Sequence, residues 1–337
     1  MSHRIETRLG ARALLCAFGA CLSLTACLDP DEAGNLVPKT VDEDPSLPSI
    51  AINGTRVHAE AFGDPTAPVI VMLHGGPGRD YSNMLRLRQP VGGVRLEDHH
   101  RVVFWDQRGA GLSRRHDAAE VTNAAYDGDL LAIVDRYAPG RPVVLIGHSW
   151  GGMYLTRFIS LHPERVAGAV LMDPGPLTGA LFTEVQGGVQ VLDVWSEWLN
   201  DTAWAQSLVT PDGHARLDYI LRLGSLGGTQ PGYHLPDPPA PVWRLGAVAN
   251  RAIQRDGMPD GTPSWDFTTG LRSYTRRVLF EAPALNEVTT PAFQARQARF
   301  YPNAEVRVIP GVGHEFMWTH PEEALAPILA YLQAIGF

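Results

Sequence analysis

The residues best placed to do chemistry form the run Gly147-His148-Ser149-Trp150-Gly151-Gly152. An apolar strand is predicted over residues 143–146 before it, and a helix over 153–161 after it. A serine on such a strand–turn–helix junction needs small neighbours, and the following helix points its N-terminus at the charge that develops during attack. Gly-x-Ser-x-Gly also arises by chance, but this context favours Ser149 as a nucleophile.

A serine hydroxyl becomes nucleophilic at neutral pH when a base takes its proton, and histidine is the usual base. His314 lies in Gly311-Val312-Gly313-His314-Glu315, after a strand predicted over residues 306–309. The other histidines lack this combination of a strand end and a glycine-rich turn; His320, at a helix start, is interpreted as a cap or surface residue. His314 is therefore the predicted base.

A second glycine-rich turn, His74-Gly75-Gly76-Pro77-Gly78, follows a strand predicted over residues 69–73. Glycines let the backbone approach a substrate closely and turn its N–H groups toward it. The backbone N–H of Gly75 or Gly76, together with that of Trp150, is predicted to form an oxyanion hole. His74 is expected to be a structural hydrogen-bonding residue.

A third motif, residues 106–113 with the sequence DQRGAGLS, follows a strand predicted over 102–105. HGGPG, DQRGAGLS and GHSWGG in this order resemble the proline iminopeptidase branch of the α/β-hydrolases, over about residues 50–175 and 276–335. The resemblance implies that the DQRG loop supports the site without doing chemistry. Asp106 and Arg108 are interpreted as an internal ion pair that fixes this loop.

The acid of the triad is expected between the serine and the histidine in the sequence. In similar proteins a Gly, two residues, an Asp and a later Pro follow the strand that is predicted here over residues 277–280, and Glu287 falls where the Asp stands. Ala284 replaces the Gly. Glu287 is the predicted acid, and Asp173, at the end of a strand predicted over 166–172, is the alternative.

The resemblance implies a serine hydrolase that removes an N-terminal residue, often proline, from a short peptide. Such an enzyme must hold the free ammonium group of its substrate, usually with acidic side chains of the cap. Glu184 and Glu197 lie in the predicted cap, although their position on a solvated helix face explains them equally well. An esterase or amidase acting on a small acyl compound is the alternative. Epoxide hydrolases of this fold need an Asp at the position of Ser149. A non-catalytic envelope binding protein is the hypothesis from a different class.

Strands and helices alternate outside residues 175–272, which predicts an α/β-hydrolase fold: a mostly parallel central sheet flanked by helices, with an inserted, mainly helical cap. The core is predicted over 49–174 and 273–337 and the cap over 175–272, a stretch with five tryptophans. Residues 49–61 alternate apolar and polar types around Asn53-Gly54, which predicts a hairpin.

The N-terminus has the pattern of an export signal. Three arginines precede an uncharged apolar run over 13–24, which is too short to span a bilayer comfortably. Leu24-Thr25-Ala26-Cys27 resembles the lipobox of bacterial lipoproteins. We predict a signal peptide over 1–26, a lipid anchor at Cys27 with a disordered tether over 27–48, and location in the cell envelope. A plain secretory signal, and an arm packed on the domain, are the alternatives.

Composition excludes other classes. The net charge is −8 and no Lys/Arg run stands out, so nucleic-acid binding has little support. Zinc-type Cys/His spacings are absent, and all three cysteines lie within the first 27 residues, which excludes a cysteine nucleophile in the mature domain. No cofactor or metal is implied, because a serine, a histidine and a carboxylate suffice.

Overall fold

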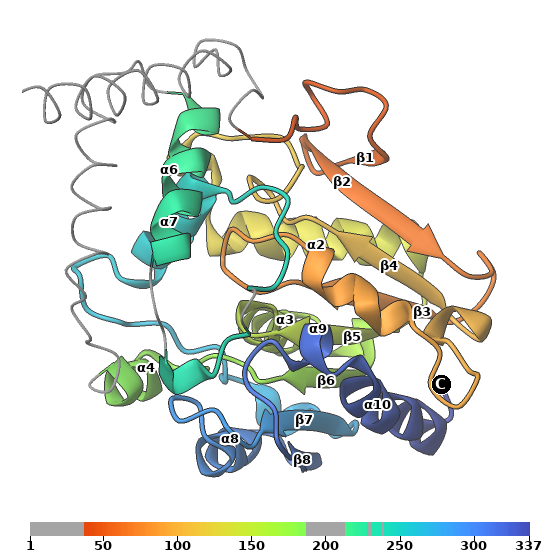
Figure 1. Cartoon of the computed structure of the whole chain (residues 1–337). Helices are drawn as coiled ribbons and strands as arrows, with labels where there is room; N and C mark the ends of the chain where they lie inside the picture. Colours follow the sequence, from red (N-terminus) through yellow and green to blue (C-terminus); the bar gives the residue numbers. More distant parts are fainter. Residues whose placement is uncertain (1–36, 187–212, 228–230, 237–238) are drawn as a thin grey trace, which may run out of the picture.

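The computed structural model describes residues 37–186, 213–227, 231–236 and 239–337 (Figure 1). Within these ranges, eight strands form one sheet. The strands are β1 Ser49–Ile52, β2 Thr55–Phe62, β3 Val69–Leu73, β4 Arg101–Trp105, β5 Val143–His148, β6 Val166–Met172, β7 Val278–Pro283 and β8 Ala304–Ile309. The longer helices are α2 Asn123–Tyr137, α3 Trp150–Leu161, α4 Gly179–Gln186, α6 His214–Gly227, α7 Ala247–Gly257, α8 Pro291–Ala298 and α10 Pro321–Ile335, with the short α9 Phe316–Thr319 and the 3-10 segments η2 Ser82–Arg88 and η6 Pro231–Tyr233.

The strand order in the sheet is β1-β2-β4-β3-β5-β6-β7-β8. β1 pairs antiparallel with β2, and β2 with β4, while all neighbours from β4 to β8 run parallel. β1 and β2 form the predicted hairpin, with Ile52 opposite Thr55 across the turn. Parallel neighbours require crossover connections, which the helices supply. The structure thus confirms an α/β-hydrolase fold with a mostly parallel sheet flanked by helices.

The central strands are buried on both faces, which is why they read as continuous apolar runs. Leu73 and Leu145 belong to the apolar layer beneath α2 and α3, while Met72 and Ile146 belong to the layer beneath α10. Figure 1 shows these helices on opposite sides of the sheet. These two layers of buried apolar side chains, one on each face of the sheet, hold the strands in register.

Because the strands from β4 to β8 are parallel, their carboxyl ends meet at one edge of the sheet, where α/β folds place their sites. Leu73 is level with Gly147 on β5, His148 with Met172 on β6, and Met172 with Glu281 on β7. The residues directly after β3, β5 and β6 therefore start from neighbouring positions.

Residues 37–48 pack on the domain, so the predicted disordered tether is wrong for this part of 27–48. Val41 is buried and its N–H bonds to the carbonyl of Leu112 at 2.8 Å. The guanidinium of Arg244 donates to the carbonyl of Pro38 at 2.8 Å and pairs with Glu43 at 3.1 Å. Acidic composition suggested a solvated chain, but a buried arginine supplies the partner that the acid needs. Residues 1–36, with Cys27, lie outside the described residues.

In the region 175–272 the structure describes α4, α6, η6 and α7, while Trp195, Trp198, Trp204 and Glu197 lie outside the described residues. Trp243 packs edge-on against Tyr81, with ring centroids 5.0 Å apart, so it is a packing residue. Among the described helices, none is long and apolar enough to cross a membrane.

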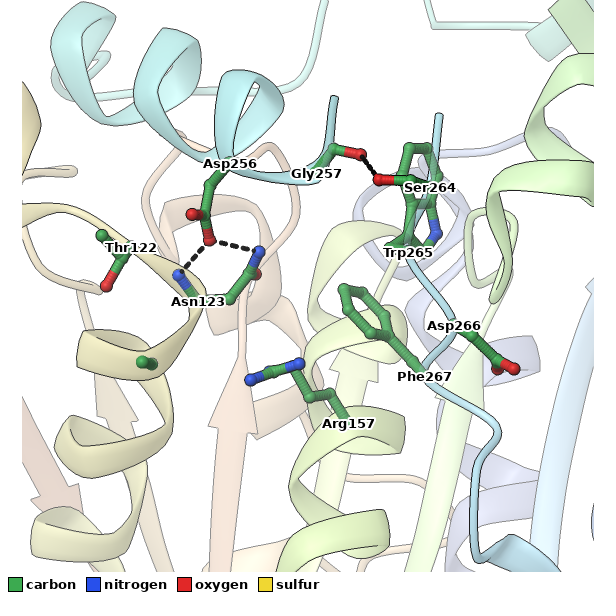
Figure 2. Close-up of a pocket in the computed structure, with 10 residues that line it drawn as sticks. Thr122, Asn123, Arg157, Asp256, Gly257, Ser264, Trp265, Asp266 and Phe267 are labelled. Carbon is green, nitrogen blue, oxygen red and sulfur yellow. Dashed lines mark hydrogen bonds between the residues drawn. The ribbon is translucent and has the colours of Figure 1, made fainter. Parts of the chain in front are cut away.

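Trp265 and Phe267 line a pocket of about 460 Å³ between the N-terminus of α2 and the end of α7 (Figure 2). Asp256 at its rim accepts hydrogen bonds from the backbone and side chain of Asn123, both at 2.8 Å. The lining includes none of the predicted catalytic residues. The pocket is thus separate from the strand ends that carry the predicted site.

Candidate active site

Ser149 stands on a strained turn between β5 and α3. Its φ of 54° and ψ of −117° lie outside the regions that L-residues normally adopt. A Cβ on Gly147 or Gly151 would come closer than 3.0 Å to backbone atoms, of Gly151 in the first case and of Leu73 in the second. The flanking glycines are therefore obligatory at this turn, as the motif predicted.

The same turn leaves the Ser149 side chain without a capping role. Ser149 occupies the N-cap position of α3, yet its hydroxyl makes no capping hydrogen bond, and the backbone carbonyl of Ser149 accepts from Gly152 instead, at 3.0 Å. The backbone N–H of Ser149 bonds to the carbonyl of Met172 at 3.0 Å. Trp150 is the first helical residue, so its N–H has no acceptor within the helix.

The loop after β3 lies against this turn. A Cβ on Gly75 would come 3.3 Å from the Cβ of Ser149 and 3.1 Å from Nδ1 of His148. Gly76 has a φ of 126°, which favours glycine. The structure thus brings Gly75 beside Ser149, and the following residue, Gly76, has a backbone conformation that favours glycine.

His74 orients the peptide between Gly75 and Gly76. The backbone N–H of Gln107 donates to Nε2 of His74 at 3.0 Å, so Nδ1 carries the proton and donates to the carbonyl of Gly75 at 2.8 Å. Burial lowers the pKa of His74, which keeps this ring neutral. Because C=O and N–H of one peptide point in opposite directions, holding the Gly75 carbonyl fixes where the Gly76 N–H points.

Gln107 connects the loops. Its side-chain amide donates to the carbonyl of His74 at 3.1 Å, and its Oε1 accepts from the indole N–H of Trp150 at 3.0 Å. The DQRG loop therefore holds the HGGPG loop and the start of α3 in fixed relation.

The predicted ion pair between Asp106 and Arg108 is wrong. Asp106 bonds to Nδ1 of His58 at 2.9 Å and accepts the backbone N–H of Leu112 at 2.8 Å. Arg108 makes a bidentate pair with Asp129 on α2, at 2.7 and 2.8 Å. The loop folds around the Asp106 carboxylate while Arg108 extends toward α2, so each finds a partner outside the motif.

His314 makes its hydrogen bond with Asp173. Nδ1 of His314 lies 2.5 Å from Oδ2 of Asp173, with the histidine side chain 13% exposed and the aspartate fully buried. Asp173 follows β6 directly, with a φ of 44° that Asp tolerates better than most residues. Glu287, by contrast, has a side chain that is 75% exposed and lies 3.5 Å from His234. The prediction that Glu287 orients His314 is therefore corrected in favour of Asp173.

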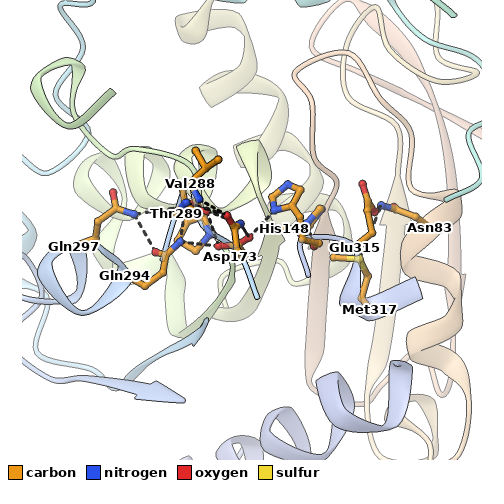
Figure 3. Close-up of polar contacts among 12 residues, drawn as sticks. Asn83, His148, Asp173, Val288, Thr289, Gln294, Gln297, Glu315 and Met317 are labelled. Carbon is orange, nitrogen blue, oxygen red and sulfur yellow. Dashed lines mark hydrogen bonds and ion pairs between the residues drawn. The ribbon is translucent and has the colours of Figure 1, made fainter. Parts of the chain in front are cut away.

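The segment expected to carry the acid instead supplies hydrogen-bond donors to Asp173 (Figure 3). Asn286 Nδ2 donates to Oδ2 at 2.6 Å, Thr289 Oγ1 to Oδ1 at 2.9 Å, and Gln294 Nε2 to Oδ1 at 2.8 Å. Sequence reasoning missed these three residues; their signal was a cluster of uncharged polar side chains around Glu287.

Two contacts hold the loop of His314 from other elements. The backbone N–H of His314 donates to the carbonyl of Tyr233 at 2.9 Å. Nε2 of His148 lies 3.0 Å from the carbonyl of His314. Burial, then the charge on His314, lowers the pKa of His148 to about 3, so His148 is neutral and donates this bond.

The electrostatics around His314 favour its protonated form. Burial alone would lower its pKa, but the charge of Asp173 and the hydrogen bond to it, with a further contribution from Glu315, raise it overall. An imidazole held in this way can take up a proton and be stabilised while it carries the charge. In the described part of the chain, no three His, Cys, Asp or Glu side chains are grouped to hold a metal ion.

Comparison with known proteins places the chain among hydrolases of several kinds. Epoxide hydrolase B of Mycobacterium tuberculosis is 35% identical over 120 residues, 35% of this chain and 32% of that protein. The proline iminopeptidase of Neisseria meningitidis is 35% identical over 118 residues, 34% of this chain and 36% of that protein. The matches thus span about a third of these relatives.

Solved structures agree on the fold. Est816, described as an N-acyl homoserine lactone degrading enzyme, has a TM-score of 0.58 and 23% identity, covering 84% of this chain and all of that one. Proline iminopeptidase of Mycobacterium smegmatis has a TM-score of 0.57 and 18% identity, covering 85% and 97%. The model of the Alpha/beta hydrolase family matches residues 70–328, most of the domain described above. The chain therefore belongs to the Alpha/beta hydrolase family.

Proposed function

We propose that the protein is a serine hydrolase in which Ser149, His314 and Asp173 form the catalytic triad. The observation that carries the proposal is the 2.5 Å contact between Nδ1 of His314 and the buried Asp173. This bond leaves Nε2 as the ring nitrogen that can accept the proton of the Ser149 hydroxyl. The exposed position of Glu287 supports Asp173 as the acid.

The proposed reaction is acyl transfer in two steps. Ser149 attacks a carbonyl carbon as His314 takes its proton, and His314 returns the proton to the leaving group. The negative oxygen is stabilised by the free N–H of Trp150 and by the N–H of Gly76, whose peptide His74 holds in place. Water then attacks the acyl-enzyme with the same base and releases the acid.

A small ester or amide is the substrate class that the described residues support best. An aminopeptidase needs a carboxylate to hold the substrate ammonium, yet Glu184 pairs with Arg296 at 2.6 Å on the surface. Buried Glu315 is likewise engaged, by Arg79. The aminopeptidase remains the second candidate, favoured by the three shared motifs and the proline iminopeptidase relatives. Ser149 at the nucleophile position argues against epoxide chemistry.

A substrate panel tests this choice. We expect short p-nitrophenyl esters to be cleaved with a higher kcat/KM than proline naphthylamide and other aminoacyl naphthylamides, because Glu184, the described candidate for binding an ammonium group, is paired with Arg296. Higher kcat/KM for the aminoacyl compounds would assign the aminopeptidase instead. A Ser149→Ala preparation serves as the blank for each substrate.

We further propose that the protein is exported and anchored through a lipid on Cys27. The support is the signal-like sequence before Cys27. With residues 37–48 packed on the domain, the proposed tether shortens to residues 28–36.

A further inference from the structure

A buried carboxylate directly follows the proposed base. The side chain of Glu315 is 3% exposed. Its Oε1 accepts a hydrogen bond from Nη1 of Arg79 at 2.8 Å, and its Oε2 accepts from Nδ2 of Asn83 at 2.7 Å. Figure 3 shows Glu315 and Asn83 beyond His148 in the same polar row as Asp173. Both oxygens of the carboxylate are thus satisfied by residues distant in sequence.

These contacts join the two loops on which the proposed mechanism depends. Arg79 directly follows the HGGPG loop, and Asn83 lies in η2 (Ser82–Arg88) just after it. Glu315 follows His314 and is the N-cap residue of α9. The bridge therefore fixes the distance between the peptide that would hold the oxyanion and the histidine that would act as base.

The carboxylate of Glu315 is ionised throughout the pH range in which His314 would act as a base. Burial would raise its pKa, but Arg79, His314 and the hydrogen bond from Asn83 lower it to about 2. The cost of burying this carboxylate is offset by its partners, as a buried ion pair requires. The pair therefore presents a fixed negative charge and a fixed positive charge beside the triad.

The groups facing His314 come from five elements. Asp173 directly follows β6, and His148 is the last residue of β5. Tyr233 belongs to η6, and its ring centroid lies 5.1 Å from that of His314. Glu315 is the N-cap residue of α9, and Arg79 follows the HGGPG loop after β3. His148 is neutral, and burial raises the pKa of Tyr233, which is neutral as well. The charged neighbours are therefore Asp173, Glu315 and Arg79. Glu315 raises the pKa of His314, and Arg79 lowers it.

We propose that Arg79 and Glu315 are positioning residues that clamp the HGGPG loop to the loop of His314 and set the pH range in which His314 acts as a base. This proposal rests on the proposed function of His314. Neither residue touches the substrate in this role; both act through His314 and through the peptide of Gly76.

Because Glu315 and Arg79 carry opposite charges, removing each of them should shift the pKa of His314 in opposite directions. A histidine ring must be neutral to accept a proton, so activity falls as the pH drops through the pKa of His314. Glu315→Gln removes a negative charge, so the acid limb of kcat/KM should move down by about one pH unit. Arg79→Met removes a positive charge, so the acid limb should move up. Arg79→Lys keeps the charge and should restore the wild-type midpoint.

A matched ion pair provides the control. Arg157 and Asp127 pair at 2.7 Å, and the Arg157 side chain is 28% exposed, the same as that of Arg79. Neither residue is among the main contributors to the pKa of His314. Arg157→Met and Asp127→Asn should therefore leave the acid limb unchanged.

The decisive readout is an NMR titration of the His314 ring in the full chain, assigned by its loss in His314→Ala. Midpoints that move in opposite directions in Glu315→Gln and Arg79→Met support the proposal. The proposal is overturned if both variants titrate with the wild-type midpoint, or if they shift in the same direction as the control variants. The titration needs no turnover, so failure of the proposed function, seen as no hydrolysis by the wild type, is distinguished from failure of the clamp.

Discussion

Asp173→Asn is expected to lower kcat on a p-nitrophenyl ester by about 10⁴-fold, the scale seen when the acid of a serine triad becomes an amide. An amide at this position can donate to Nδ1 of His314, which favours the tautomer that carries its proton on Nε2 and cannot accept another. An NH₂ group in place of Oδ2 would also face the Nδ2 donor of Asn286, while Thr289 and Gln294 would still donate to the oxygen at the Oδ1 position. Both effects act on the base, so the loss should appear in kcat.

The matched variant is Glu287→Gln, which changes a carboxylate at the position that the sequence favoured. Its side chain is 75% exposed and contacts His234 rather than His314. We expect less than about a threefold change, as for most surface substitutions. A large loss in Glu287→Gln with an active Asp173→Asn would return the acid role to Glu287.

Gly151→Ala is expected to destabilise the fold by about 3 kcal/mol or more, at the upper end of overpacking effects. A Cβ there would come closer than 3.0 Å to the carbonyl of Leu73 and to the carbonyl oxygen of His74. Leu73 is paired with Gly147 of β5 at the end of β3, so this backbone cannot move away without disturbing the pairing of β3 with β5. Urea unfolding, followed by circular dichroism, measures the change.

Gly213→Ala is the control for this substitution. Among the described residues, a Cβ on Gly213 would meet nothing within 4 Å, and its backbone has no positive φ. Because Gly213 directly precedes α6, where glycine is favoured over alanine, the substitution should cost no more than about 1 kcal/mol. If Gly151→Ala unfolds at the same urea concentration as Gly213→Ala, the close packing of the turn against β3 is wrong.

Local features of the sequence predicted the elements well. Buried parallel strands read as apolar runs, so residues 69–73 and 166–172 coincide with β3 and β6. β5 and β7 extend beyond their predicted ends, to His148 and Pro283, because hydrogen bonding continues where the apolar pattern stops. The turn at Ser149 was readable because its demand for glycines is local.

The acid was not readable because it depends on which strand end comes closest to His314. Asp173 and Glu287 both follow strands at the same edge, and spacing alone cannot rank them. In the fold, Asp173 lies under the histidine and Asn286 bonds to it, while the next side chain, Glu287, faces outward. The same limit applies to the arm over 37–48, whose buried contacts depend on Arg244, about 200 positions away in the chain.

Labelling of the full chain with a fluorophosphonate probe, with the modified residue identified by mass spectrometry, tests directly whether Ser149 is the nucleophile. We expect labelling of the wild type at Ser149, none in Ser149→Ala, and strongly slowed labelling in His314→Ala. An unlabelled wild type, or equal labelling of Ser149→Ala, would contradict the assignment of Ser149 as the nucleophile.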